Sequence, residues 1–330
     1  MSTLLDINSD LGILATIGHT PLIRLKHVLG NIPFQLFGKL EMFNPGGSAK
    51  DRSALSILKN ALKQGTIQSD TTVIESSSGN MGIGLAQACA YFKLKFICVV
   101  DPKTTTQNIA ILKAYGAHID LVTEPSRETG EFLHARLNRV QYLLETIPNS
   151  FWANQYANED NPRAYYQTMH ELLEQLEGKI DYLFCATSTC GTLRGCSEYA
   201  RKQNLGVQIM AVDAQGSAIF KSTHGPRLIP GHGAGIRPPL YLPDLAHKII
   251  FASDKECVIG CRRLLKQEAI LAGGSSGAII MALERIKHEI APNAVCVAIL
   301  CDRGERYLDT IYSDAWVKEN IGDIACLYSK

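Results

Sequence analysis

The sequence lacks long apolar stretches and an excess of charge of either sign. No apolar run reaches the roughly 18 residues that a membrane-spanning helix needs. Thirty-three Lys and Arg residues balance 32 Asp and Glu residues, which gives a formal net charge of +1 at pH 7. A chain so close to neutral has no long-range field that would attract nucleic acid or an anionic membrane surface. We therefore expect neither a nucleic-acid partner nor a membrane partner.

Signals for export, disulfides and metal binding are missing as well. The first ten residues contain neither a basic region nor an apolar core, so we expect a cytosolic protein. Ten cysteines are present, but none forms a Cys-x-x-Cys pair or lies at metal-ligand spacing from a histidine. We expect core thiols and no metal site. Cys190 is the exception, because a helix start could lower its pKa, although packing is the role that we expect.

The remaining pattern is that of a parallel α/β protein. With 330 residues and a mass of 36.2 kDa, the chain is long enough for two lobes with cores of their own. Apolar, strand-like runs alternate with helical patterns, which predicts a mainly parallel sheet flanked by helices. The strand-like runs are residues 34–40, 72–75, 95–100, 118–122, 181–186, 207–212, 248–251 and 295–300.

Residues 44–52 carry the most informative polar motif, in which glycines and a serine precede Lys50 at a predicted helix start. A lysine amine can form an imine with an aldehyde cofactor and can then serve as a base that moves a proton. The same residues also fit an ordinary helix start, with Ser48 as the N-cap and Asp51 near the positive helix end. Taken alone, this segment favours the ordinary helix start.

Two further loops favour the cofactor interpretation, because each follows a strand-like run and precedes a predicted helix. Residues 188–192 form a loop of small residues, whose backbone N–H groups and hydroxyls could hold a phosphate. Residues 76–82 repeat this pattern with three serines and Asn80, which could bind a substrate carboxylate or a ring oxygen. Taken alone, each loop is better explained by ordinary helix capping, but the three segments together are harder to explain in that way.

In order and spacing, these segments resemble the fold type II pyridoxal phosphate enzymes, of which cysteine synthase and cystathionine β-synthase are the best-known members. The resemblance covers about residues 11 to 312 and is carried by residues 20–25, 44–52, 77–80, 154–155, 188–192, 274–277 and 302–307. It implies two lobes, each with a mainly parallel sheet flanked by helices, and pyridoxal 5'-phosphate in the cleft. The smaller lobe would be residues 40–152, and residues 11–39 plus 153–330 would form the larger one. A homodimer is also implied.

The resemblance assigns roles to individual residues. Lys50 would form the Schiff base, Asn80 would bond the ring hydroxyl, and Ser275 would face the pyridine nitrogen. The cofactor phosphate would lie in a cup of five residues, Ser188, Thr189, Cys190, Gly191 and Thr192. The substrate carboxylate would be bound by Ser77, Ser78, Gly79, Asn80, Met81 and Gln155. A hydroxyl opposite the ring nitrogen does not enforce a pyridinium, which favours β-elimination or β-replacement over transamination.

Several departures from the cysteine synthase pattern resemble a siderophore-pathway subgroup. They lie at residues 100–103, 156–161, 212–220 and 302–303. Enzymes of this subgroup join O-phospho-L-serine to L-glutamate through an aminoacrylate, and the product is a precursor of 2,3-diaminopropionate. Arg136, Tyr156 and Arg237 are candidates for binding the additional anionic groups of these substrates. Each also has an ordinary interpretation, as a surface helix residue, a packed ring and a loop cation, respectively.

Four functions therefore compete. The first is this carbon–nitrogen synthase, and the second is cysteine synthase or a cystathionine β-synthase relative, with sulfide or homocysteine as the nucleophile. Against cystathionine β-synthase, the sequence has no N-terminal Cys-x-x-His pair and no regulatory domain after residue 330. The third is a lyase or dehydratase, and the fourth is a catalytically silent scaffold, which would not require Lys50. Residues 314–330, with Trp316, Cys326 and Tyr328, lie beyond the strong resemblance and could cover the cleft or bind a partner.

Overall fold

The computed structural model describes residues 11–127, 130, 132–221 and 225–324, and in it the chain forms two compact units. The first unit comprises residues 11–18 and 44–164, and the second comprises residues 19–43 and 165–324. Residues 11–18 and 153–164 thus belong to the first unit and residues 40–43 to the second, whereas the resemblance placed each of these segments in the other lobe. The reason is packing, because Leu14 and Ile17 are buried in the core of the first unit.

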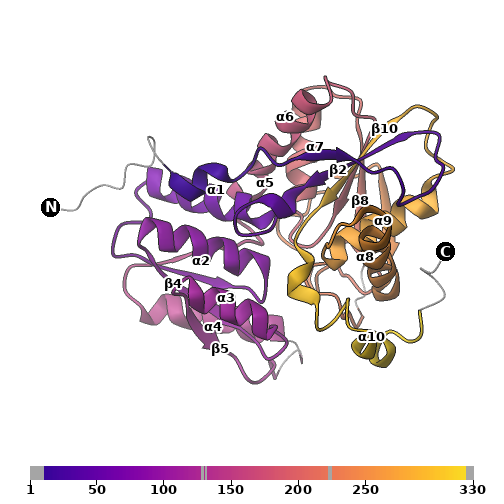
Figure 1. The fold of residues 1–330 in the computed structure, drawn as a ribbon. Coiled ribbons are helices and arrows are strands. Elements are labelled where there is room, and N and C mark those ends of the chain that lie inside the picture. The colour runs from indigo at the N-terminus through magenta and orange to yellow at the C-terminus, as the bar shows by residue number, and fades with distance from the viewer. Residues whose placement is uncertain (1–10, 128–129, 131, 222–224, 325–330) are drawn as a thin grey trace. The chain divides into compact units, whose positions relative to one another are not determined.

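A four-stranded, all-parallel sheet in the order β5-β4-β3-β6 forms the centre of the first unit (Figure 1). Its elements are η1 (Gly12–Thr16), α1 (Lys50–Lys63), β3 (Thr72–Ser76), α2 (Asn80–Phe92), β4 (Lys95–Val100), α3 (Thr106–Ala114), β5 (His118–Leu121), α4 (Phe132–Thr146), β6 (Ser150–Trp152) and α5 (Asp160–Arg163).

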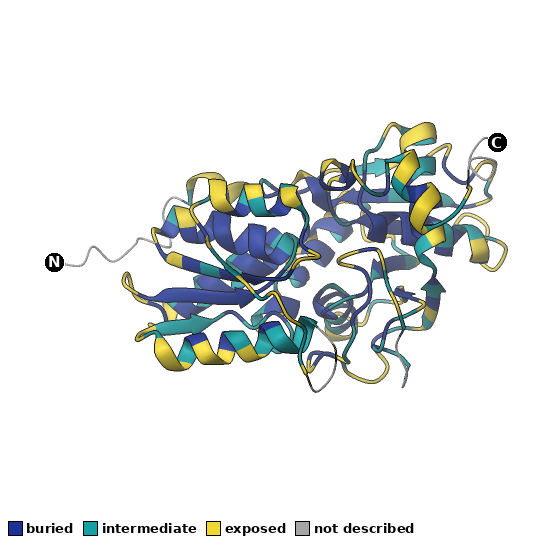
Figure 2. Ribbon diagram, turned by 90° about the horizontal axis from the view of Figure 1, so that it is seen from below, coloured by how far each residue is buried: buried dark blue, intermediate teal, exposed yellow. Residues whose placement is uncertain are grey.

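Helices cover both faces of this sheet. On one face, Val73 and Phe96 join the core that contains buried residues of α1, α2 and α3. On the other face, Ile74 and Val99 pack with Val140 of α4. Because both faces are covered, β3 is buried at every position, and Figure 2 draws strands of this unit in dark blue and in teal, the colours of buried and intermediate residues. The carboxyl ends of β3 and β4 therefore present their polar residues at one edge of the sheet.

The second unit contains a six-stranded sheet in the order β1-β2-β10-β7-β8-β9, in which only β1 runs antiparallel to its neighbour. Its elements are β1 (Leu22–Arg24), β2 (Gln35–Leu40), η2 (Glu41–Phe43), α6 (Tyr165–Gln175), β7 (Tyr182–Ala186), α7 (Gly191–Lys202), β8 (Gln208–Ala214), β9 (Lys248–Ala252), α8 (Asp254–Glu268), α9 (Gly274–Ile286), β10 (Val295–Leu300), η3 (Gly304–Tyr307) and α10 (Asp314–Asn320).

Two glycines allow α8 and α9 to pack closely against each other. A Cβ atom on Gly260 would lie 2.1 Å from the Gly277 carbonyl oxygen, and one on Gly277 would lie 2.1 Å from the Cys257 carbonyl oxygen. Such distances leave no room for any side chain. Gly277 belongs to one of the segments that carry the family resemblance, and its role here is helix packing.

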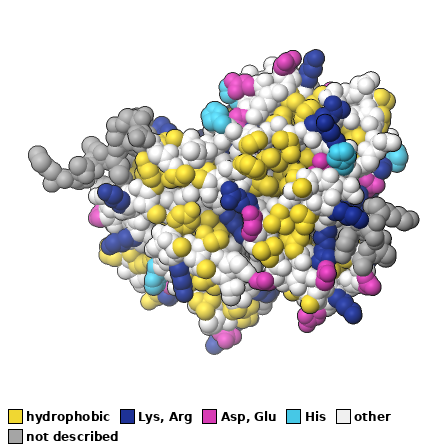
Figure 3. Space-filling view, viewed as in Figure 1, with side chains coloured by type: hydrophobic (Ala, Val, Ile, Leu, Met, Phe, Trp, Pro, Cys, Tyr) yellow, Lys and Arg dark blue, Asp and Glu magenta, His cyan; other side chains and the backbone are white. Residues whose placement is uncertain are grey.

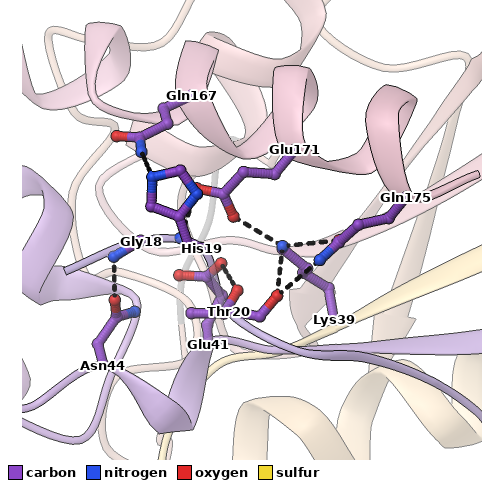
Figure 4. Close-up of polar contacts among 9 residues, drawn as sticks. All are labelled: Gly18, His19, Thr20, Lys39, Glu41, Asn44, Gln167, Glu171 and Gln175. Atoms are coloured by element: carbon purple, nitrogen blue, oxygen red, sulfur yellow. Dashed lines mark hydrogen bonds and ion pairs between the residues drawn. The ribbon is translucent and has the colours of Figure 1, made fainter. Parts of the chain in front are cut away.

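A buried lysine links β2 to α6 in the second unit (Figure 4). Lys39 is fully buried, and its Nζ lies 2.7 Å from the Glu171 carboxylate. The same nitrogen donates to the Thr20 carbonyl oxygen at 2.8 Å and to Gln175 Oε1 at 3.0 Å. The other oxygen of Glu171 accepts the backbone N–H of His19 at 2.8 Å. These contacts compensate for burying the charges, so removing one partner alone would be costly.

The C-terminal segment packs on its own unit as far as the structure describes it. Val317 and Ile324 are buried in the core of the second unit, and Trp316 packs against that core. Residues 314–324 are therefore a packed part of this unit, and their role in covering the cleft or binding a partner stays a prediction. Cys326 and Tyr328 lie outside the described residues.

Cationic and anionic side chains are interspersed on the face drawn in Figure 3. Within the described ranges, no helix is both long and apolar enough to cross a membrane.

The cysteines of these ranges are free thiols, and all of them except Cys301 are buried.

Candidate active site

Lys50 is the first residue of α1, and a tight polar turn precedes it. The backbone N–H of Gly46 donates to Asp51 Oδ2 at 2.6 Å, which fastens the turn to the first turn of the helix. The N-cap position falls on Ala49 and not on Ser48 as the sequence predicts. Ser48 Oγ instead accepts the N–H of Lys50 at 3.2 Å. The lysine is half-buried, and its backbone is therefore fixed at the start of a well-packed helix.

The loop between β3 and α2 is fixed by the hydroxyl of Ser77. Its Oγ accepts the N–H groups of Gly79 at 3.3 Å and Gly82 at 3.0 Å. Ser77 is itself buried. Ser77 therefore holds the start of α2, and its role in binding the substrate carboxylate stays a prediction.

The other residues of this loop divide into those that can face a ligand and one that packs inward. Ser78, Gly79 and Asn80 are half-buried, and the Ser78 carbonyl oxygen accepts a hydrogen bond from Asn108 at 2.9 Å. The Met81 side chain is buried in the core of the unit, so only its backbone N–H could contact a carboxylate. Because the first N–H groups of a helix have no acceptor within the helix, the start of α2 fits an anion.

Gln155 lies beside this loop and is attached to it. Its side-chain Nε2 donates to the Ser76 carbonyl oxygen at 3.1 Å, and its backbone N–H donates to Glu75 Oε2 at 3.1 Å. Glu75 Oε1 accepts the N–H of Ser76 at 2.9 Å. Burial raises the pKa of Glu75 to about 7, although its two backbone hydrogen bonds lower it. Sequence reasoning missed this residue, and the only available signal was an acid inside an otherwise apolar strand.

Arg136 and Tyr156 are the predicted residues for the additional substrate groups in this unit. Arg136 of α4 is buried, and its Nε lies 3.2 Å from Asp101 Oδ2 in an ion pair. Among the described residues, its Nε has no hydrogen-bond partner of normal geometry. Arg136 is therefore not the exposed surface residue of its ordinary interpretation. Tyr156 is half-buried in the turn that follows Gln155.

In the second unit, residues 188–192 lie between β7 and α7. Cys190 has a left-handed backbone, with φ of +66°, and its carbonyl oxygen accepts the N–H of Arg194 at 2.8 Å. Ser188 and Thr192 are half-buried, whereas Thr189, Cys190 and Gly191 are buried. Burial raises the pKa of the Cys190 thiol to about 12, so the thiol is protonated at neutral pH and packs as we expected. The N-terminus of α7 is thus framed by small residues, as phosphate binding requires.

A buried polar cluster lies beside this loop. Thr187 donates to Asp213 Oδ1 at 2.8 Å, and the Thr187 carbonyl oxygen accepts the N–H of Gly233 at 2.7 Å. Burial raises the pKa of Asp213 and lowers the pKa of His232 to about 4. The His232 imidazole is therefore neutral at physiological pH. Sequence reasoning missed both residues, although a histidine between two glycines was a visible signal.

Ser275 and Arg237 have different surroundings in the same unit. Ser275 is buried in the first turn of α9, next to Gly273, which donates its N–H to the Asp302 carbonyl oxygen at 3.0 Å. Arg237 is exposed, its Nε donates to the Ile219 carbonyl oxygen at 2.9 Å, and its guanidinium stacks on Tyr241. These contacts favour the ordinary interpretation of Arg237 as a loop cation.

A family model described as pyridoxal-phosphate dependent enzyme matches residues 13–302. The chain belongs to this enzyme family. The predictions of an α/β fold type II architecture, an enzyme and pyridoxal phosphate as the cofactor are thereby confirmed.

Solved structures of the family resemble this chain over nearly its whole length. O-acetyl serine sulfhydrylase isoform 3 from Entamoeba histolytica is 33% identical, with a TM-score of 0.85 over 92% of each chain. An O-acetylserine dependent cystathionine β-synthase from Helicobacter pylori is 31% identical, with a TM-score of 0.84 over 91% of this chain and 98% of that one. An O-ureido-L-serine synthase is 29% identical, with a TM-score of 0.84 over 92% of this chain and 98% of that one.

The residues present fit the cofactor of the family. An aldehyde needs a lysine amine, which Lys50 offers, and a phosphate needs a helix N-terminus lined by small residues, which α7 offers. The names of the three similar enzymes indicate different products. Membership of the family therefore establishes a synthase chemistry of the β-replacement type and leaves its substrates open.

Proposed function

We propose that the protein is a β-replacement synthase, a transferase that joins O-phospho-L-serine to L-glutamate. The Cβ–O bond of O-phosphoserine breaks, phosphate leaves with the bonding electrons, and the glutamate amine forms a new bond to Cβ. The product is N-(2-amino-2-carboxyethyl)-L-glutamate, which would supply 2,3-diaminopropionate for siderophore synthesis. The homodimeric state and the cytosolic location remain predictions from the sequence.

Pyridoxal 5'-phosphate, when bound, supplies the electron sink that makes the substrate α-proton acidic. Lys50 would bond the cofactor, the residues of the 188–192 cup would hold its phosphate, and Ser275 would face its ring nitrogen. Asn80 would bond the ring hydroxyl. Lys50 Nζ, once replaced by the substrate amine, would take the proton from the α-carbon and return it there after the new bond forms. The N–H groups at the start of α2, with Ser78, would orient the α-carboxylate.

The observation that carries the choice of substrates is the ion pair of Arg136 with Asp101. Asp101 lies in residues 100–103, a segment that departs from the cysteine synthase pattern, and the pair places a cation at the carboxyl end of the parallel sheet. Sulfide carries no carboxylate and would need no such cation. O-phosphoserine and glutamate bring a phosphate and two carboxylates, and an arginine fork is suited to bind either group. Tyr156, one residue beyond Gln155, would supply a hydroxyl to the same groups.

A product assay by mass spectrometry tests this assignment directly. The purified holoenzyme is given O-phosphoserine or O-acetylserine, each with glutamate or with sulfide. We expect a condensed product only with O-phosphoserine and glutamate. Efficient formation of cysteine with glutamate ignored would contradict the proposal and assign the protein to sulfur assimilation.

Substitution of Arg136 tests the anion-binding role. Loss of a charge-assisted hydrogen bond costs about 1.5 to 3 kcal/mol, so Arg136→Met should raise the KM for an anionic substrate by about tenfold or more. The matched control is Arg139→Met on the same helix, because Arg139 is partly exposed and pairs with Asp120 at 2.9 Å. If both variants behave alike, the charge of Arg136 has no specific role.

A further inference from the structure

Glu75 lies where two predicted substrate-binding segments meet in the first unit. It is the fourth residue of β3 and is 1% exposed. Each of its two carboxylate oxygens accepts a different backbone N–H group. Oε1 accepts the N–H of Ser76 at 2.9 Å, and Oε2 accepts the N–H of Gln155 at 3.1 Å. One side chain thus holds both the start of the 76–80 loop and the backbone of Gln155.

A third contact closes this arrangement. Gln155 Nε2 donates to the Ser76 carbonyl oxygen at 3.1 Å, so Gln155 is fixed to the loop by its side chain as well as through Glu75. The orientation of the remaining amide atoms of Gln155 therefore depends on where Glu75 holds its backbone. A shift of a few tenths of an ångström there would move both groups that are proposed to bind the carboxylate.

The hydrogen bonds continue from Gln155 to the helix that begins with Lys50. The Gln155 carbonyl oxygen accepts the side-chain amide of Asn161 at 2.7 Å, and Asn161 Oδ1 accepts the Ser53 hydroxyl at 2.8 Å. Ser53 lies on α1, three residues after Lys50, and all three side chains are buried. Buried hydrogen bonds of this kind fix relative positions, because an unpaired member would cost the full desolvation energy.

Two charged groups accompany Glu75. The positive charge of Arg136 on α4 acts against the burial that raises the pKa of Glu75, and Arg136 is in turn paired with Asp101 beyond the end of β4. Burial, followed by the nearby charge of Glu75, raises the pKa of the Cys98 thiol on β4 to about 12. The carboxyl group is therefore part of the same polar end of the sheet as the proposed anion-binding arginine.

We propose that Glu75 is a positioning residue, which holds the 76–80 loop and Gln155 in the geometry that binds a substrate α-carboxylate. Hydrogen bonds through Asn161 and Ser53 connect Gln155 to α1, the helix that begins with Lys50. The inference rests on the proposed role of this loop in carboxylate binding, and it is independent of which nucleophile the enzyme uses.

The test compares two ligands that differ only in the carboxylate. L-Alanine and ethylamine are titrated into the holoenzyme, and the dissociation constant of each is measured from the cofactor absorbance. A glutamine has one acceptor oxygen where the glutamate has two, so Glu75→Gln must leave one of the two N–H groups without its acceptor. We expect the variant to bind L-alanine about tenfold more weakly and to bind ethylamine as before.

Asp120→Asn is the matched control, because Asp120 is an ion-paired carboxylate on β5 of the same sheet. It should leave the ratio of the two dissociation constants unchanged. Equal weakening of both ligands in Glu75→Gln, or no weakening of either, would overturn the inference. General destabilisation alone would lower the melting temperature and the cofactor content without changing this ratio.

A second variant keeps the test decisive should Glu75→Gln fail to fold. Ser53→Ala removes the far end of the hydrogen-bonded chain and should weaken L-alanine binding about threefold relative to ethylamine. If Ser53→Ala leaves the ratio of the two dissociation constants unchanged, Asn161 and Ser53 do not help to position the loop and Gln155. Because neither ligand contains phosphate or a second carboxylate, the result does not depend on the product assay proposed above.

Discussion

Gly46 shows how closely the turn before Lys50 is fitted. A Cβ atom on Gly46 would lie 2.7 Å from Asp51 Oδ1, so the carboxylate that accepts the Gly46 N–H would have to move. Gly46→Ala should therefore destabilise the protein by about 1 to 3 kcal/mol, as expected for a buried donor that loses its acceptor. Urea unfolding of the variant measures this cost. Gly206→Ala is the control, because open space surrounds that position and the variant should unfold like the parent.

Single residues also mark the limit of what the sequence predicts. The loops around Lys50, Asn80 and Cys190 could be identified because clusters of glycine and hydroxyl residues are typical of the start of a helix. Glu75 and His232 each left only a weak signal in the sequence and were missed, because their surroundings come from burial among residues that are distant in the sequence. Arg136 was a candidate from the subgroup resemblance, but the ion pair with Asp101 appears only when α4 and β4 are brought together.

Helix α8 offers a test at the scale of one element. Ser253 Oγ accepts the N–H of Glu256 at 3.2 Å, and the Glu256 carboxylate accepts the N–H of Ser253 at 2.8 Å, which completes a capping box. Ser253→Ala removes one half of it and should cost about 1 kcal/mol of stability. The free energy of urea unfolding is the measurement. An unchanged value would mean that packing between α8 and α9 alone fixes the start of the helix.

The pattern of strands was largely predictable for a physical reason. All eight strand-like runs contain a strand, in part because strands covered on both faces, such as β3 and β10, appear as continuous apolar segments. The two strands that were missed, β1 and β6, have three residues each and lie at the edges of their sheets. Strands this short carry too few residues for a recognisable pattern, and their positions depend on the neighbour with which they pair.

Two buried groups should give the whole molecule an unusual dependence of stability on pH. Glu75 has its pKa raised from 4.5 to about 7, so the folded state holds an extra proton between these values. Its stabilising contribution is complete below pH 4.5 and is lost as the pH rises through 7. His232 has its pKa lowered from 6.5 to about 4, so its contribution is present above pH 6.5 and is lost as the pH falls. Between about pH 5 and 6 the two contributions oppose each other.

Variants at these positions separate the two contributions. Each group can change the free energy of unfolding by up to about 1.4 kcal/mol per pH unit. Between about pH 5 and 6, Glu75→Gln should therefore show a more positive slope of stability against pH than the parent, and His232→Gln a more negative one. Urea unfolding at several pH values measures both slopes. Slopes identical to the parent in both variants would contradict the burial-driven pKa shifts. If the two units unfold in separate transitions, the two slopes belong to different transitions.

The order in which the sheet of the second unit is assembled has a consequence for synthesis on the ribosome. Strand β2 lies between β1 and β10, and its register pairs Gln35 with Val295 and Leu40 with Leu300. The first unit is complete in sequence once residue 164 has been made, and it can fold while translation continues. Strand β2, in contrast, is made before the first unit is complete and cannot acquire its parallel neighbour β10 until Leu300 has been translated. Throughout that interval a largely buried strand has one open edge, and unpaired strand edges of this kind make nascent chains prone to aggregation and dependent on chaperones.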